Sequence, residues 1–146
     1  MSERGKNDPL RDELDQLFAD LWNASSFAGH RRGFRPAVDS YRCDDPPRLF
    51  VVIELAGVDP QAIQIVLHDR TLLVAGERAR PVACGRRYQQ MEIDYGHFHR
   101  RIHLHEHVDP DAVAATYEQG LLTIVLPITT KAAGPVQVPI QLRSKQ

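Results

Sequence analysis

Cysteine, aromatic residues and net charge are all scarce in this chain of 146 residues. Two cysteines, Cys43 and Cys84, are too few for a disulfide scaffold. The formal net charge is −1, so no overall field favours binding to nucleic acid or to an acidic membrane. No apolar run reaches the roughly 18 residues of a membrane span. We therefore expect a soluble protein, and a cytoplasmic one because MSERGKNDPLRDELDQ lacks the apolar core of a secretory signal.

Motifs of the common catalytic and cofactor-binding sites are missing as well. The sequence has no Gly-rich phosphate loop with a lysine, no Gly-x-Ser-x-Gly elbow and no cysteine pair at redox or zinc spacing. Hydrophobic residues make up 42% of the chain, which is enough for one packed core. We expect one domain with extensions that is not an enzyme and has no catalytic residues, no cofactor and no specific metal.

A helical pattern comes first in the chain. Asp8 and Pro9 suit the cap and the first position of a helix of roughly 14 residues, and the segment 23–34 that follows reads as a mobile linker. Apolar residues recur at helical spacing at Leu10, Leu14, Leu17, Phe18, Leu21 and Trp22. So short a helix is marginal alone in water. The stripe therefore docks on its own domain or is buried in partner subunits or clients.

From Val38 onward the pattern is that of strands. Short segments rich in β-branched or aromatic residues alternate with turn residues, as in an antiparallel β-sandwich. The predicted strands are 49–55, 62–68, 71–77, 87–93, 97–104 and 121–126. Turns are predicted at 57–60, 108–111 and 118–120.

Five of the seven histidines fall between His97 and His107, at every second position apart from an arginine at 101. In a strand these side chains share one face, while Phe98, Arg100, Ile102 and Leu104 point to the core. The histidine face is expected to be solvated. Metal binding is the more specific alternative. Neighbouring rings on one strand face lie about 6.6 Å apart, so two rings would have to lean together to share an ion. If this face makes a contact in an assembly, protonation of the row should weaken it.

Two stretches carry motifs in a familiar order. The first, at 35–78, reads RPAVDSYRCDDPPRLFVVIELAGVDPQAIQIVLHDRTLLVAGER, and the second, at 95–127, reads YGHFHRRIHLHEHVDPDAVAATYEQGLLTIVLP. Together they resemble the α-crystallin domain of small heat-shock proteins. Ala56-Gly57 stands where the family has proline-glycine, and Leu104-His105 where it has leucine-proline. Neither change touches the core face.

The resemblance implies an all-β, immunoglobulin-like antiparallel sandwich at 37–130. It also implies a partly helical, flexible N-terminal arm at 1–36 and an extended C-terminal tail at 131–146. The implied function is that of an ATP-independent holdase, which binds partly unfolded client proteins and prevents their aggregation. A β-sandwich adaptor for one folded partner is the alternative, followed by a histidine-rich metal-binding protein.

The resemblance also implies how subunits assemble. Val138 and Ile140, in GPVQVPIQLRSKQ, resemble the family's tail anchor for a neighbouring domain, with an intrachain strand as the alternative. The groove for this anchor is expected between strands 71–77 and 121–126, lined by Leu72, Val74, Leu122 and Ile124, with plain sandwich core as the alternative for that face.

The loop ARPVACGRRYQQMEIDYG resembles, in its length, the bacterial and plant type that forms homodimers by strand exchange, the units of larger homo-oligomers. Tyr88, Met91 and Ile93 would belong to the exchanged strand. Arg100 matches the family's arginine at the dimer contact. On an apolar face it would need a carboxylate partner, or its stem would reach to solvent.

Overall fold

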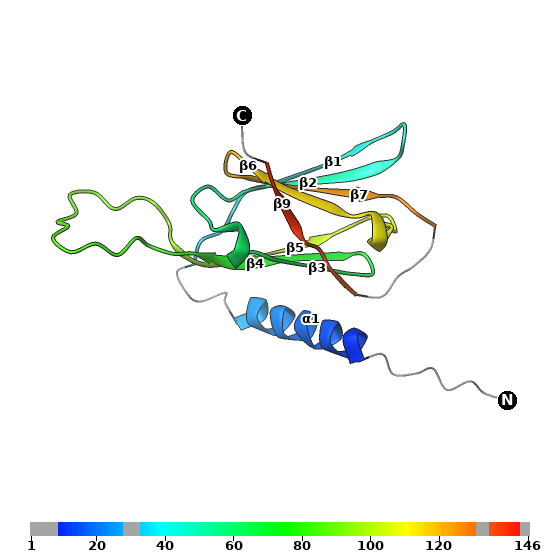
Figure 1. The fold of residues 1–146 in the computed structure, drawn as a ribbon, viewed down its shortest axis with the longest axis horizontal. Coiled ribbons are helices and arrows are strands. Elements are labelled where there is room, and N and C mark those ends of the chain that lie inside the picture. Colours follow the sequence, from blue (N-terminus) through cyan, green and yellow to red (C-terminus); the bar gives the residue numbers. More distant parts are fainter. Residues whose placement is uncertain (1–8, 28–32, 131–134, 144–146) are drawn as a thin grey trace.

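Two β-sheets packed face to face form the body of the molecule (Figure 1). The computed structural model describes residues 9–27, 33–130 and 135–143. Sheet A has the strand order β1 (Val38–Cys43), β2 (Arg48–Glu54), β7 (Leu121–Pro127), β6 (Ala114–Glu118) and β9 (Ile140–Leu142). Sheet B has the order β5 (Gly96–His103), β4 (Thr71–Arg78), β3 (Gln64–His68) and β8 (Val136–Gln137). Paired strands are antiparallel except β6 and β9. The predicted β-sandwich is confirmed.

The core lies between the two sheets and follows the alternation of the strands. In β7 every second side chain, at Leu122, Ile124 and Leu126, is fully buried, and the residues between them are more exposed. Removing each such side chain from water contributes roughly 1.5–3 kcal/mol. The other fully buried core residues include Val51, Ile53, Leu55, Ile65, Leu72 and Val74. The sheets are therefore held together by apolar contact between their inner faces.

Two short 3-10 helices carry the chain from one sheet to the other. In η2 (Pro60–Ala62) the carboxylate of Asp59 accepts a hydrogen bond from the backbone N–H of Gln61 at 2.9 Å. In η3 (Pro110–Ala112) Asp109 accepts in the same way from the N–H of Asp111 at 3.0 Å. Aspartate at the cap and proline at the first position favour such a turn. The turns predicted at 57–60 and 108–111 are confirmed.

The predicted strand at 87–93 is wrong for the isolated chain. Residues 79–95 form no strand and instead make a long exposed loop between β4 and β5 (Figure 1). The segment has the alternation of a strand, but within the described residues no strand of the same chain pairs with it. Strands β1 and β6 were not predicted, and β8 and β9 lie in the tail, where an intrachain strand was the alternative.

The N-terminal helix α1 (Pro9–Phe27) lies beside sheet B, on the side away from sheet A (Figure 1). Its start agrees with the prediction. It continues to Phe27, so the linker expected from residue 23 is wrong over its first five residues, and its residues 28–32 lie outside the described ones. The chain then reaches the sandwich at Phe34, whose ring packs edge to face on Phe98 at 5.8 Å.

Candidate assembly and client-binding surfaces

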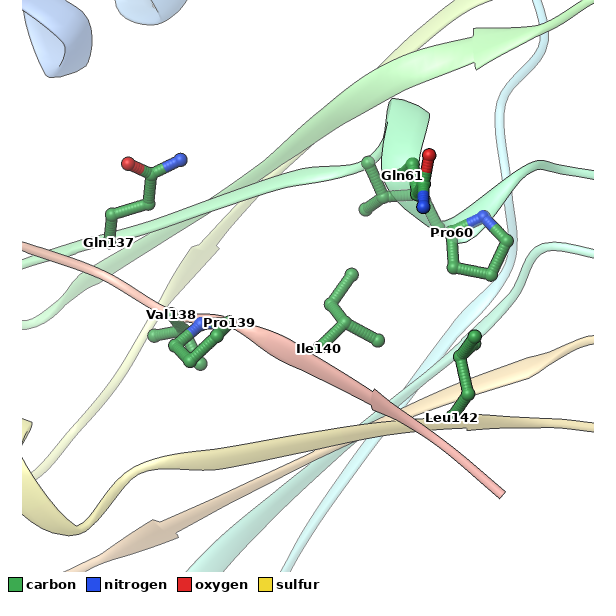
Figure 2. Close-up of a pocket in the computed structure, with 8 residues that line it drawn as sticks. Pro60, Gln61, Gln137, Val138, Pro139, Ile140 and Leu142 are labelled. Atoms are coloured by element: carbon green, nitrogen blue, oxygen red, sulfur yellow. The ribbon is translucent and has the colours of Figure 1, made fainter. Parts of the chain in front are cut away.

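The C-terminal tail lies across the open side of the sandwich and touches both sheets. The N–H of Val138 donates to the carbonyl oxygen of Ile65 in β3 at 2.9 Å, while Ile140 pairs with Ala115 of β6. Val138 is only 4% exposed and belongs to the core cluster. Pro139 separates the two anchors and holds that part of the chain extended. The tail thus adds one short strand to each sheet and bridges them (Figures 1 and 2).

A hollow of about 560 Å³ opens beside the tail, next to Ile140 (Figure 2). Pro60, Gln61 and Ile63 line one side of it. The tail residues Gln137, Val138, Pro139, Ile140 and Leu142 line the other. Leu142 is 66% exposed, so the tail is less covered beyond Ile140 than at Val138.

The predicted groove lining is wrong. Leu72, Val74, Leu122 and Ile124 lie in the sandwich core, with at most 1% of each exposed. They sit on β4 and β7, which have a neighbouring strand on both sides. The tail instead meets β3 and β6, the strands that would end the two sheets without it. An edge strand leaves backbone N–H and C=O groups to pair with an added strand, and an interior strand does not.

The tail docks on its own chain here, which is the alternative that the sequence left open. Short intrachain strands β8 and β9 hold Val138 and Ile140 in place. The residues expected to anchor the tail are therefore at the contact. Insertion into a neighbouring subunit remains a prediction.

Helix α1 turns most of its apolar stripe toward sheet B. Leu14, Leu17, Phe18 and Leu21 are half-buried. The ring of Phe18 lies 4.7 Å from that of His68 and 5.8 Å from that of Trp22. Trp22 is 37% exposed and Leu10 is 62% exposed, so the two ends of the stripe are covered least. Of the two placements considered from the sequence, this chain shows the helix docked on its own domain.

The 79–95 loop displays large apolar side chains that the described chain leaves about half or more exposed. Val82 is 99% exposed, Met91 59%, Ile93 62% and Tyr88 49%. The guanidinium group of Arg80 lies 5.6 Å from the ring centre of Tyr88. Hydrogen bonds from Arg86 and then Arg80 lower the pKa of Tyr88. Exposed apolar side chains on one projecting loop make this loop a candidate interaction surface.

Arg100 is half-buried on the core side of β5, as its parity predicts. Its Nη1 donates to the backbone carbonyl oxygen of Pro36 at 2.7 Å. Burial, and next the nearby Arg35, lower the pKa of Arg100. Among the described residues its hydrogen-bond partner is this carbonyl, and the expected carboxylate is not found. A role for Arg100 in a dimer remains a prediction.

The histidine row follows the predicted parity. Phe98 and Leu104 are buried, whereas His97, His103 and His105 are exposed. Burial, followed by Arg101, Arg35 and Arg100, lowers the pKa of His99. The rings of His103 and His105 meet at right angles, 5.8 Å apart. In residues 9–27, 33–130 and 135–143, no group of three histidine, cysteine or acidic side chains is arranged to hold a metal ion.

Sheets, tail and helix together define a β-sandwich of the α-crystallin class, and the sequence comparisons agree. The family model described as "Hsp20/alpha crystallin family" matches residues 43–141. The chain belongs to this family of small heat-shock proteins, which is a family of chaperones.

Named relatives cover most of the chain. It is 33% identical over 138 residues to "Alpha-crystallin" of Mycobacterium tuberculosis, covering 90% of this chain and 88% of that protein. It is 30% identical over 131 residues to "18 kDa heat shock protein" of Streptomyces albus G, covering 87% and 85%.

Solved structures show the same fold. Heat shock protein 16.0 from Schizosaccharomyces pombe superposes with a TM-score of 0.62 at 26% identity, covering 74% of this chain and 99% of that one. The hspA protein of Xanthomonas axonopodis gives a TM-score of 0.58 at 30% identity, covering 68% and 98%. No helix in the described part of the chain is long and apolar enough to cross a membrane.

Proposed function

We propose that this protein is an ATP-independent holdase that binds partly unfolded clients and prevents their aggregation in the cytoplasm. The observation that carries the proposal is the storage of apolar surface in segments that can detach or associate. The tail lays two apolar anchors on the sheet edges through only two short strands, and the 79–95 loop exposes four large apolar side chains. Unfolded clients offer mainly apolar surface, so such segments are suited to bind them.

We further propose that two copies pair by exchange of the 87–93 segment. Strand β1 ends sheet A, and no strand of the described residues pairs with its outer edge; its Tyr41 is 50% exposed. An added strand would cover that edge. A hollow of about 240 Å³ between β1 and β5 is lined in part by Phe50 and Ile102. Because it adjoins β1, it could receive an apolar side chain from a strand added there.

Larger assemblies would use the tail. If Val138 and Ile140 leave their own domain and dock on the same edges of a second copy, the contacts are unchanged and only the chain connectivity differs. Burying two such side chains is worth roughly 3–5 kcal/mol before the entropy cost of docking, which suits a reversible contact.

Light scattering of a heat-denatured model client tests the holdase proposal. We expect equimolar protein to suppress aggregation equally with and without ATP. No suppression at equimolar or higher ratios would overturn the proposal. The alternative, an adaptor for one folded partner, rests on the exposed loop alone; it predicts a native mass of a monomer or dimer together with no suppression.

A further inference from the structure

The outer face of sheet B carries a buried apolar pair that is separate from the sandwich core. Val66 of β3 and Leu73 of β4 lie opposite each other in the strand register and are 0% and 2% exposed. Their strand neighbours, among them Ile65 and Leu72, belong to the core cluster, and these two do not. Because side chains alternate along a strand, Val66 and Leu73 point away from sheet A. Helix α1 lies over that face (Figure 1).

Specific contacts fix the helix on this face. The guanidinium group of Arg101, which pairs with Leu73 in the register, lies 3.3 Å from the ring centre of Trp22. Its Nη2 also donates to the backbone carbonyl of Trp22 at 3.3 Å. At the other side of the face, Nε2 of His68 is 3.8 Å from Oδ1 of Asp15. A cation over a tryptophan ring is attracted by the negative face of the ring.

The helix and the face also have complementary charge. Over residues 9–27 the helix has four carboxylates, at Asp12, Glu13, Asp15 and Asp20, and one arginine. The face presents the fixed cation Arg101, and His68 lies 3.8 Å from Asp15 of the helix, while the carboxylate of the face, Glu77, lies at its far end opposite His97. A partner for this face is therefore an acidic amphipathic helix with an aromatic side chain near one end.

A hollow of about 390 Å³ remains between helix and sheet, lined by residues including Phe18, Trp22 and Thr71. This hollow is open to solvent. The helix therefore covers the apolar pair and leaves the margin of the face accessible. A helix that must be held by such a contact exchanges more readily than one packed into a core.

We propose that the outer face of sheet B is a second client-binding surface, specific for acidic amphipathic helices, and that α1 masks it in the resting chain. A client segment that forms such a helix would compete with α1 for the face. That the competitor is a client rests on the proposed chaperone function. The mask and the competitor bind through the same groups: the apolar pair and Arg101.

The first test uses Trp22, the only tryptophan of the chain, as a reporter of the mask. In the full-length protein, Arg101→Gln should raise the acrylamide quenching constant of Trp22 about twofold, because the stacked guanidinium is lost. Arg101→Lys, which keeps the charge, should give a smaller rise. An unchanged constant in Arg101→Gln, or wild-type quenching equal to that of free tryptophan, would overturn the proposal.

The second test measures binding to the face. The probe is a fluorescein-labelled peptide of residues 9–27, and the control is a scrambled peptide of the same composition. Full-length Leu17→Ala/Phe18→Ala, with a weakened mask, should bind the peptide at least tenfold more tightly than wild type. Adding Arg101→Gln should remove most of the gain. Equal binding of the scrambled peptide, or no gain from the weakened mask, would contradict the proposal.

Two controls keep the outcome clear. Far-ultraviolet circular dichroism and urea unfolding show whether each variant keeps the sandwich, and a variant that loses it is replaced by Leu21→Ala. The aggregation assay is run on the same samples. If the protein suppresses aggregation but does not bind the peptide, this inference is overturned and the holdase proposal stands. If it binds the peptide but does not suppress aggregation, the holdase proposal is overturned and the helix-binding face stands.

Discussion

The tail and the 79–95 loop both carry apolar residues expected to meet another subunit. In the isolated chain the tail anchor is buried, whereas the loop residues are exposed. Val138 in the tail is 4% exposed, whereas Met91 and Ile93 in the loop are 59% and 62% exposed. The tail pairs with strand edges of its own chain, at β3 and β6, whereas the loop pairs with no strand in the part of the chain that the structure describes. An apolar segment is satisfied within one chain only where an unpaired edge lies within its reach. The loop is therefore the stronger candidate for an intermolecular contact.

The largest expected effect on stability concerns the residues wrongly assigned to the tail groove. Leu122 is fully buried in the core, so Leu122→Ala should lower the free energy of unfolding by about 2–5 kcal/mol. Urea denaturation measures this. If Leu122 lined an open groove instead, the free energy of unfolding would fall by less than about 1 kcal/mol. That result would contradict the assignment of Leu122 to the core and of the tail contact to β3 and β6.

The tail anchors should have a smaller effect. Val138→Ala/Ile140→Ala removes one buried and one half-buried apolar contact, so we expect the free energy of unfolding to fall by about 2–3 kcal/mol. Size-exclusion chromatography with light scattering should also show smaller assemblies. The matched control is Leu142→Ala, at a residue 66% exposed, which should stay within about 0.5 kcal/mol of wild type. Equal effects of both changes would refute the anchor assignment.

Loop substitutions should change the assembly but barely change the stability of the folded chain. Met91→Asp/Ile93→Asp places two charges on the proposed exchange segment, so the native mass should fall toward that of a monomer. The unfolding free energy should change by less than about 0.5 kcal/mol, since both side chains are exposed. Ala79→Asp/Ala83→Asp adds the same charge to the same loop, at exposed residues outside the exchange segment 87–93. If that control lowers the mass equally, charge alone explains the effect and the exchange contact is disproved.

The smallest effect expected is a change in pH dependence. Burial lowers the pKa of His99 below its ordinary value of 6.5, so the unfolded chain takes up the proton more readily than the folded one. Stability should therefore fall as the pH drops below about 6.5. Replacing the ring by His99→Gln should flatten this slope, measured by urea unfolding at pH 7.5 and 5.5. His105→Gln, at an exposed ring, serves as control, and an unchanged slope in His99→Gln would count against the assignment.

The sequence predicted those parts of the fold that depend on local patterns. Strands with clear apolar alternation were found, whereas β1 was missed because four of its six residues are exposed and its pattern is mostly polar. The groove lining was mistaken because parity identifies a buried face but not which strands end a sheet. Strand order depends on long-range pairing, which one sequence does not reveal.

Two further errors have the same origin. The alternation at 87–93 describes a segment able to pair, but within the described residues it pairs with neither of the outer strands β1 and β5. Helix α1 continues past Trp22 through residues of low helix propensity such as Asn23. The position of Arg101 beneath Trp22 could not be found from spacing, because 79 residues separate them.

Hydrogen–deuterium exchange of the full-length protein, with and without a heat-destabilised client, tests the central claim most directly. If detachable segments bind clients, then at equal client loading the amides of the 79–95 loop should become protected and those of the tail, residues 135–143, should exchange faster. The amides of β2 and β7 in the core should not change. Protection confined to the core strands, or no change anywhere while aggregation is suppressed, would contradict the account.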